Sequence, residues 1–565
     1  MIANLFRIKS VDRIVTESEK SKDKLKRTLT WVDLIFLGIG AIVGAGIFAT
    51  IGTAAAGDGI RPGAGPALIV SFVLTGIACG FSAFCYAEFA AMVPIAGSAY
   101  TYAYATLGEV IAWIIGWDLI IEYAIGNVAV AISWSGYFSE LLAGFGIILP
   151  GWMTIDYRTA VKKDEILHAT GQAFTACKDF LFDFFPCLQG LWPSWLPMDP
   201  NTILAKEQII SNAPHLFGIP VVFNLPAVAI VTLLTVLIVI GIKESARFNE
   251  IMVTIKLIVL AFFCGIGYMY LKPENYTPFA PNGWAGIQSG AAIIFFAYIG
   301  FDAVSTLAEE TKDPGKDLPI GIVGSLVVCT IIYILVTVVF CGLIPFDVLK
   351  EKLASEKAEP LTMAIRYIGT FPNVGEFTQR IVHFAAGIVA FGSVVAHTAV
   401  LLVFQIGQPR IFFSMARDGL LPKAFMSVHP TYKTPYFSTI LTGVFVAGFA
   451  AFMNIDEMVD LCNIGTLFAF VLVCIGIIIL RIREPNRKRP FKVPGGFIIP
   501  IFGVLTCLML TYSLPGQTWL RFLIWLIVGL FIYVGFGYRN SRLARGADGA
   551  QDKDVPPELE DIDKF

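Results

Sequence analysis

The chain has 565 residues, of which 56% are hydrophobic and 15% are charged, and its formal net charge is −2. Soluble domains average about 45–50% apolar and about 25% charged residues, so this composition excludes an ordinary soluble protein and predicts one embedded in a lipid bilayer. No basic face lies outside the flanks of the apolar segments, which argues against nucleic acid as a partner.

Apolar runs of about 20 residues, the length that a helix needs to cross a bilayer, occur along most of the chain. They follow a polar N-terminal tail, residues 1–30, which lacks the apolar region of a signal peptide. We predict an all-α integral membrane protein with about twelve membrane-spanning helices, at residues 31–55, 66–93, 108–147, 222–242, 250–271, 284–308, 319–344, 381–408, 435–453, 458–481, 497–514 and 518–538.

Lysine and arginine in short loops predict the orientation in the membrane. The opposite side of the membrane keeps few such cations, for example Arg61 and Lys272, although the loop at 346–380 carries five. Both termini are therefore expected in the cytoplasm, and the protein in the plasma (inner) membrane. This orientation places the following cations on the cytoplasmic side: Lys22, Lys24, Lys26, Arg27, Lys243, Arg247, Lys312, Lys316, Arg410, Arg417, Lys423, Lys433, Arg481, Arg483, Arg487, Lys488, Arg489, Lys492, Arg539, Arg542 and Arg545.

Residues 148–221 form the longest interruption between two spans and are predicted to make a small helical cap on the outer face. Cys177 and Cys187 lie in this polar segment, where a disulfide in an oxidising compartment and two free thiols both remain open. The polar tail at 541–565 ends in an acidic run and is predicted to be disordered. No cysteine spacing resembles a zinc or haem motif, so neither a metal nor a cofactor is expected.

Glycines interrupt two apolar segments near their middle: Gly44 and Gly46 in the first, and Gly300 in the sixth. Glycine costs about 1 kcal/mol relative to alanine inside a helix, and unwound backbone at this depth is tolerated only where it is buried in protein or lines a cavity. We therefore predict that spans one and six are broken helices. The alternative for span one is close helix packing through Gly40 and Gly44, which form a G-x-x-x-G pair.

The two predicted breaks lie five spans apart, and an odd offset inverts the topology of the second unit. Residues 31–271, including the insertion at 148–221, and residues 284–481 are thus predicted to form two inverted repeats, followed by two further spans in 497–538. This pattern is typical of a secondary transporter with a substrate site near the middle of the membrane.

Two broken helices expose backbone groups of opposite polarity. The N–H groups at the new N-terminus of span one and the helix dipole favour a carboxylate, and the small residues at 44–46 leave its approach open. The carbonyl groups freed in span six suit an ammonium group. The sequence therefore predicts an amino acid as the substrate.

The same segments resemble a known family. Residues 38–48, GIGAIVGAGIF, resemble the first-helix signature of the amino acid–polyamine–organocation (APC) superfamily, and residues 296–302, FAYIGFD, followed by Glu309 and Glu310, resemble its sixth helix. Residues 407–422, GQPRIFFSMARDGLLP, and 489–495, RPFKVPG, resemble its cytoplasmic loops. The combination is most similar to the cationic amino acid transporter-like branch in its bacterial twelve-helix form, and it covers about residues 28–538 apart from 148–221.

This resemblance implies a LeuT-like fold of 5+5 inverted repeats and a defined substrate site. The carboxylate side of the implied site is Gly44, Ala45 and Gly46. The ammonium side is the set of carbonyl groups of Ile42, Phe296, Ala297 and Ile299, with the ring of Phe296 as a gate. Ala45 departs from the family pattern, because relatives often carry a hydroxyl residue there.

A charged residue inside a span costs about 2.5–3.5 kcal/mol on insertion scales, so each one requires a reason. For Lys256 in span five, the resemblance implies a lysine that replaces the sodium ion of sodium-driven relatives and exchanges a proton during transport. The alternative is that its long side chain snorkels to the cytoplasmic interface. Glu122 and Asp118 lie deep in span three, and Glu122 is a candidate for biasing the site towards cationic substrates.

Three further polar residues lie within apolar spans. The resemblance places His397 of span eight beside the substrate side chain, where an imidazole would tune selectivity; the alternative is a hydrogen-bonded interior histidine. Asp302 is a candidate cap for the second half of span six. Glu88, near the inner end of span two, is predicted to pair with loop arginines in a structural role.

The sequence favours a proton-coupled amino acid importer or exchanger, with an amino acid, a proton and the lipid bilayer as partners. Small or medium neutral amino acids are the first expectation and cationic ones the second. An amino acid/polyamine exchanger and a membrane sensor that binds an amino acid without moving it remain alternatives. No H-E-x-x-H, G-x-S-x-G or P-loop motif is present, so the chain is not expected to be an enzyme.

Overall fold

The computed structural model describes residues 7–9, 11, 27–58, 60–94, 98–157, 159–160, 209–210, 212–216, 219–240, 246–355, 359–371, 375–432 and 434–543. Cys177 and Cys187, most of the insertion at 148–221 and most of the two tails lie outside these residues. Their predicted pairing, cap and disorder therefore stay predictions.

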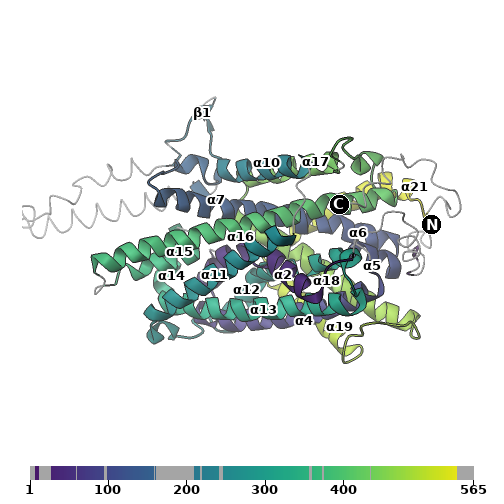
Figure 1. Ribbon diagram of the computed structural model, residues 1–565, viewed down its shortest axis with the longest axis horizontal. Coiled ribbons are helices and arrows are strands. Elements are labelled where there is room, and N and C mark those ends of the chain that lie inside the picture. The colour runs from purple at the N-terminus through teal and green to yellow at the C-terminus, as the bar shows by residue number, and fades with distance from the viewer. Residues whose placement is uncertain are drawn as a thin grey trace, which may run out of the picture.

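The described chain is a bundle of long apolar helices (Figure 1). Eight helical segments are long and apolar enough to cross a membrane. They comprise η3 with α4 (Gly65–Ala67, Leu68–Met92), α6 to α7 (Glu109–Ile120, Gly126–Gly144), α11 (Ala246–Tyr270), α12 with η8 and η9 (Gly283–Ile294, Phe295–Tyr298, Asp302–Glu310), α13 (Pro314–Leu343), α16 (Glu376–Arg417), α18 (Ile455–Arg483), and α20 to α21 (Gly516–Ile532, Tyr538–Asn540).

A ninth span is broken into two parts. Helix α2 (Trp31–Ile42) and the segment Gly46–Ala56, which comprises η2 (Gly46–Thr50) and α3 (Ile51–Ala56), meet at an angle of 45°. Three shorter apolar helices, α10 (Leu225–Ile240), α17 (Tyr436–Phe452) and α19 (Ile498–Tyr512), complete the set. Within the described residues this makes nine candidate spans and three shorter apolar helices, which confirms the predicted all-α membrane fold.

The connecting segments carry shorter elements. Helix α5 (Ser98–Thr106) joins spans two and three, and α14 (Phe346–Ser355) and α15 (Pro360–Ile368) join spans seven and eight. In the described part of the insertion, β1 (His215–Leu216) and β2 (Ile219–Pro220) pair antiparallel, with His215 opposite Pro220. The small helical cap predicted for this segment does not include these strands.

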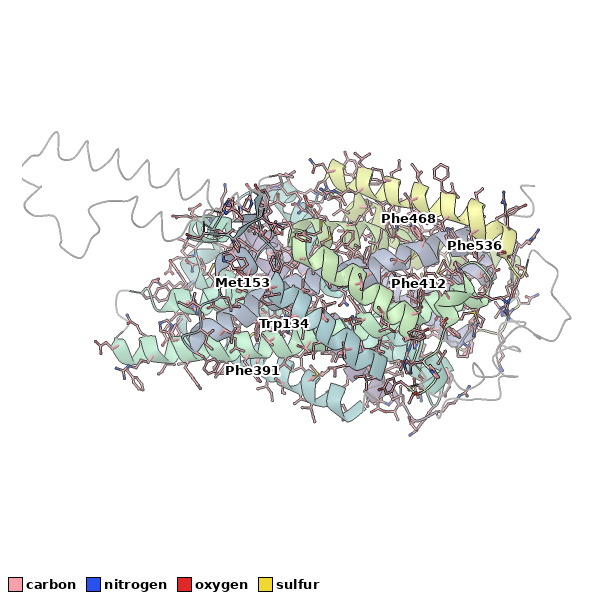
Figure 2. All side chains as sticks on the ribbon, turned by 90° about the horizontal axis from the view of Figure 1, so that it is seen from above. Trp134, Met153, Phe391, Phe412, Phe468 and Phe536 are labelled. Carbon is pink, nitrogen blue, oxygen red and sulfur yellow. The ribbon has the colours of Figure 1, made fainter. Side chains whose placement is uncertain are left out.

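Helices far apart in the chain pack together. Helix α13 lies along α4, and α10 lies along α17 (Figure 1). Apolar side chains project outward along the bundle (Figure 2), and Phe391 of α16, for example, is 50% exposed. Trp113 in α6 is fully buried. Exposed apolar side chains of this kind require lipid as the surrounding solvent.

Both described ends of the chain meet at one residue, Glu109. The N–H group of Glu109 donates to the carbonyl of Arg7 over 2.9 Å. The Ser541 hydroxyl donates to Glu109 Oε2 over 2.6 Å, and the Tyr533 hydroxyl donates to Oε1 over 3.0 Å. The two described ends therefore lie at the same end of the bundle.

Glu88 fixes the end of α18. Its fully buried carboxylate accepts from Arg481 Nε over 3.1 Å and from the Val493 N–H over 2.8 Å. A second hydrogen bond joins a terminal nitrogen of Arg481 to Oε2, and Arg489 forms a further ion pair with the same carboxylate. The prediction that Glu88 pairs with loop arginines is confirmed.

Candidate functional site

The first span is interrupted where the sequence places its glycines. Helix α2 ends at Ile42, and Val43 is extended, with φ −78° and ψ 102°. The next helical turn begins at Gly44, whose carbonyl accepts from the N–H groups of Ile47 and Phe48 over 3.2 and 3.3 Å. The N–H groups of the residues at 44–46 thus belong to the first turn of a new helix, where they have no acceptor within that helix.

The sixth span is interrupted at Ile299 and Gly300. Ile299 is extended, with φ −61° and ψ 136°, and Gly300 has φ +114°, a conformation that residues with a Cβ rarely adopt. The helical turns on either side are η8 and η9. The carbonyl groups near Phe296 and Ala297 therefore lie at the end of a helix, where intrahelical donors are missing.

The two interruptions lie directly against each other. A Cβ atom added to Gly46 would lie 2.1 Å from the Cα atom of Ala297, and one added to Gly300 would lie 2.9 Å from the Ala41 carbonyl oxygen. Each break therefore contains a glycine because the other break leaves no room for a side chain. Phe296 and Ile299 are buried beside this contact.

Lys256 of α11 reaches the break in the first span. Its Nζ atom donates to the carbonyl oxygens of Gly40 over 2.6 Å and Val43 over 3.0 Å. The side chain is fully buried. The snorkelling alternative is wrong, because the ammonium group binds the unwound backbone in the interior rather than the membrane interface.

Tyr333 of α13 joins the two breaks, and the sequence analysis missed it. Its hydroxyl lies 3.0 Å from the Ile42 carbonyl oxygen and 2.8 Å from that of Ala297. One hydroxyl donates one proton, so it serves one of these carbonyls at a time. Only one sequence feature could have pointed to this residue: Tyr333 is the only tyrosine in the apolar segment 319–344.

His397 of α16 is fully hydrogen-bonded. Nδ1 lies 2.6 Å from the Ser393 carbonyl oxygen, and Nε2 lies 2.7 Å from the Ser133 hydroxyl. A carbonyl can only accept, so Nδ1 carries a proton, and in a neutral ring Nε2 accepts from Ser133. The ring also packs on Phe48 and Tyr137, with centroids 5.8 and 5.7 Å away. The interior hydrogen-bonded position is thus observed, adjacent to the second half of span one.

Glu122 and Asp302 are buried carboxyls that lie within electrostatic range of each other. Glu122 lies in η4 (Ile121–Ile125), a π-helical turn in span three, and the buried rings of Tyr86 and Tyr123 lie near both acids. Neither carboxylate oxygen of Asp118 has a hydrogen-bond partner within the described residues. This cluster adjoins the break in span six.

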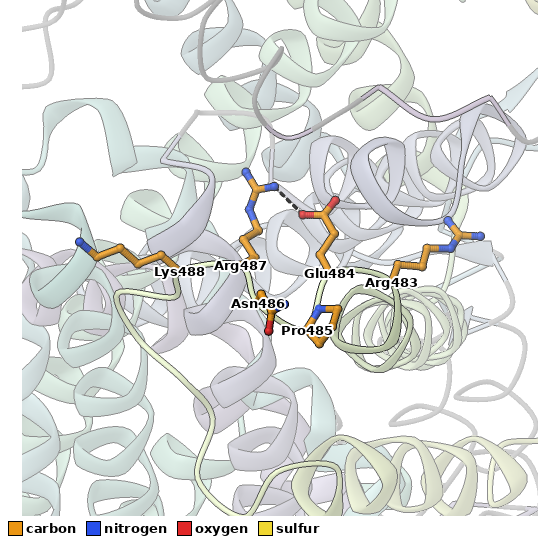
Figure 3. Close-up of a pocket in the computed structure, with 6 residues that line it drawn as sticks. All are labelled: Arg483, Glu484, Pro485, Asn486, Arg487 and Lys488. Atoms are coloured by element: carbon orange, nitrogen blue, oxygen red, sulfur yellow. Dashed lines mark hydrogen bonds and ion pairs between the residues drawn. The ribbon is translucent and has the colours of Figure 1, made fainter.

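A surface pocket of about 550 Å³ lies elsewhere, at the C-terminal end of α18 (Figure 3). Its lining includes Arg483, Lys488, and the pair formed by Arg487 and Glu484, whose side chains are hydrogen-bonded over 2.5 Å. It contains none of the backbone groups exposed at the two breaks. The contact between the breaks therefore remains the candidate substrate site.

A multi-pass helical protein in which two interrupted spans expose backbone polar groups to each other belongs to the class of membrane transporters. Comparison with known proteins gives the family: the amino acid permease model matches residues 29–538, so the chain belongs to the amino acid permeases of the APC superfamily. These proteins are permeases and not enzymes, which agrees with the sequence analysis.

Three relatives illustrate the range of the family. A methylthioribose transporter of Bacillus subtilis (strain 168) is 40% identical over 96% of this chain and 100% of that protein. The branched-chain amino acid permease BcaP of the same organism is 41% identical over the same shares. A vacuolar cationic amino acid transporter of Arabidopsis thaliana is 34% identical over 86% of this chain and 68% of that protein.

Proposed function

We propose that this permease is a secondary active, proton-coupled transporter that binds an amino acid between its two broken spans. The N–H groups of Gly44, Ala45 and Gly46 would hold the carboxylate. The carbonyl groups of Ile42, Phe296, Ala297 and Ile299 would hold the ammonium group, with the ring of Phe296 as the gate. The observation that carries this proposal is the direct contact of the two breaks, which brings a helix N-terminus and freed carbonyls together.

Lys256 is proposed as the proton-coupling group. Its protonated form donates to the carbonyls of Gly40 and Val43, which tethers the first half of span one to α11. A neutral amine has one donor fewer and no charge, so deprotonation would weaken this tether and free α2 to move. Proton binding and the opening of span one would thereby be linked.

We also propose the inverted repeats and the membrane orientation that the sequence predicts. Residues 31–271 and 284–481 would form the two inverted repeats of a LeuT-like fold, with residues 497–538 outside them. Both termini would lie in the cytoplasm and the protein in the plasma (inner) membrane. The shared position of the described chain ends at Glu109 supports an even number of crossings.

For the substrate side chain we propose a small or medium neutral amino acid. His397 would border the side-chain space, since its ring contacts Phe48 just beyond the first break. The Glu122 carboxyl would bias the site towards cationic substrates if it faced that space in its charged form. The names of the relatives point to branched-chain and cationic amino acids for those proteins.

Uptake into proteoliposomes tests this function. Purified protein would be assayed with each of the twenty amino acids, with and without an inward proton gradient, and with methylthioribose as a competing probe. We expect one group of amino acids to accumulate, and more strongly with the gradient. Entry of methylthioribose with no amino acid uptake would contradict the proposal, and amino acid binding in a thermal-shift assay without uptake would favour a sensor.

A further inference from the structure

One face of α18 carries three polar residues that the proposed site does not use. Asp456, Asp460 and Asn463 are spaced i, i+4 and i+7, which places them on one side of the helix, and we call them the α18 polar face. Asn463 is fully buried and Asp460 nearly so. Polar side chains inside a membrane helix are costly, so this face is expected to have a purpose.

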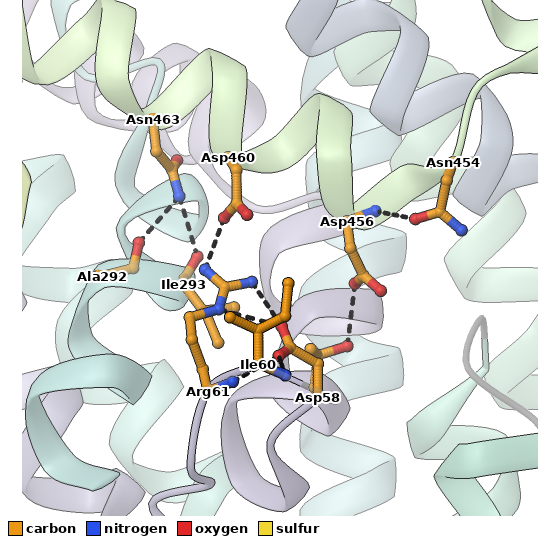
Figure 4. A network of polar contacts seen from close by, with 10 residues as sticks. Asp58, Ile60, Arg61, Ala292, Ile293, Asn454, Asp456, Asp460 and Asn463 are labelled. Carbon is orange, nitrogen blue, oxygen red and sulfur yellow. Dashed lines mark hydrogen bonds and ion pairs between the residues drawn. The ribbon is translucent and has the colours of Figure 1, made fainter. Parts of the chain in front are cut away.

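The outer part of this face holds the end of span one (Figure 4). Arg61 donates to Asp460 Oδ1 over 2.7 Å, and through Nε and a terminal nitrogen to Asp58 Oδ2 over 3.0 and 2.8 Å. Asp58 Oδ1 also accepts from the N–H groups of Ile60 and Arg61 over 2.8 and 2.7 Å. Charge-assisted bonds of this kind are among the strongest in proteins.

The loop that contains these residues follows α3 directly, so it moves with the second half of span one. The Thr53 hydroxyl of α3 also donates to Asp456 over 3.2 Å. Burial alone would raise the pKa of the Asp58 carboxyl, but the charge and hydrogen bonds of Arg61 outweigh it and lower this pKa below the ordinary value. The loop therefore presents a fixed ion pair to α18.

The inner part of the face holds the end of α12. The Asn463 amide donates through Nδ2 to the carbonyl oxygens of Ala292 and Ile293 over 2.9 and 3.3 Å (Figure 4). These carbonyls belong to the last turn of α12, just before η8, which contains Phe296 and Ala297. Asn463 thus fixes the segment whose carbonyls are proposed to bind the ammonium group.

We propose that the α18 polar face couples closure of the outer loop to the geometry of the substrate site, with Asp460 and Asn463 as positioning residues on one rigid helix. This inference rests on the proposed function. Asp460 and Asn463 are separated by about 4.5 Å along the helix axis, three residues at about 1.5 Å each, so a shift of α18 moves both. Loss of the Arg61–Asp460 ion pair would therefore displace Asn463 from Ala292 and Ile293. This displacement would in turn shift the carbonyl groups of span six that follow these two residues.

The test is a double-mutant cycle on the full chain, with L-isoleucine and L-arginine as probes. Arg61→Gln and Asn463→Leu should each weaken binding of the better probe by about tenfold, and the double variant should bind no more weakly than the worse single variant, because coupled residues are not additive. Arg521→Gln breaks a second ion pair of α18, between Arg521 and Glu457 over 3.0 Å, and keeps the Arg61–Asp460 pair, so it should change the Kd by less than about twofold. A hundredfold loss in the double variant, or an unchanged Kd for Arg61→Gln, would overturn the coupling.

Hydrogen–deuterium exchange separates this inference from the proposed function, because it needs no substrate. Arg61→Gln should speed exchange of the amides at 290–300, and Arg521→Gln should leave them unchanged. If Arg61→Gln does not fold, Asp460→Asn weakens the same pair and serves in its place. Equal exchange in variant and wild type refutes the coupling, whereas wild type that binds neither probe refutes only the proposed substrate class.

Discussion

Gly46 of the first span lies against Ala297 of the sixth so closely that a methyl group on Gly46 would be 2.1 Å from the Ala297 Cα atom. Two backbones that are about 250 residues apart in the chain meet without a side chain between them. Backbone N–H groups of the first span and carbonyl groups of the sixth therefore lie close enough for one small ligand to bind both.

Gly46→Ala should weaken amino acid binding, because the added methyl forces the two breaks apart. We expect the Kd to rise at least about tenfold, a loss of about 1.4 kcal/mol, measured by thermal shift or equilibrium binding. Gly80→Ala in α4 is the matched control, since a Cβ there meets nothing within 4 Å. Equal affinity in the two variants would contradict the placement of the carboxylate site.

Gly44→Leu tests the same site from the side of α16. A Cβ on Gly44 would lie 2.7 Å from a methyl carbon of Val400, and a leucine side chain would also obstruct the N–H groups of the new helix turn. The protein should remain folded by gel filtration while binding is lost. Retained binding would move the substrate away from this turn.

Lys256→Met should remove the dependence of uptake on a proton gradient, since methionine keeps the volume but cannot carry a proton. Two buried carbonyls lose their donor, which costs about 1–3 kcal/mol for each unsatisfied group, so the melting temperature should also fall. Lys272→Met is the control, because Lys272 lies over the ring of Phe371 in a loop. Uptake that still doubles with the gradient in the Lys256 variant would rule out the coupling role.

Tyr333→Phe should weaken substrate binding by about fivefold, the equivalent of one hydrogen bond of about 1 kcal/mol, because the carbonyls of Ile42 and Ala297 lose their shared donor. Tyr276→Phe removes a comparable bond, from a tyrosine hydroxyl to the Val338 carbonyl over 2.6 Å, away from the breaks. Competition binding would compare the two variants. The same affinity in both would show that Tyr333 acts only on stability.

His397→Ala should shift the substrate profile towards larger side chains, because it opens space beside Phe48 and Tyr137. Ser133→Ala keeps the ring and removes only the hydroxyl that bonds to Nε2, so it should alter the profile less. Inhibition of uptake by a panel of unlabelled amino acids measures the effect. An identical order of inhibitors in wild type and His397→Ala would leave the histidine with a structural role alone.

Most of the fold could be predicted from the apolar runs and from the glycines that interrupt them. Each span needs about 20 apolar residues, and this requirement is visible in the sequence without any tertiary contact. Gly44, Gly46 and Gly300 marked the breaks because glycine is disfavoured inside a helix unless backbone must approach closely.

Contacts between distant segments were not predictable in the same way. Tyr333 and Asn463 look like ordinary polar residues in apolar runs. Only the packed structure shows that Tyr333 donates to carbonyls at the two breaks and Asn463 to carbonyls in the last turn of α12. The contacts of the Lys256 side chain could not be predicted either, because a lysine at this position can reach the membrane interface or a neighbouring helix. The roles assigned to the substrate-binding residues and to the proton remain predictions.

The contact of both chain ends with Glu109 has a practical consequence for labelling the protein. Residues 538–543 pack into the structure through Ser541, and the segment at 7–9 reaches the same place through Arg7. A fluorescent or affinity domain should therefore be fused beyond residue 543, because a fusion that replaces Ser541 would remove its hydroxyl from the buried Glu109 carboxylate and release the C-terminal end from the bundle.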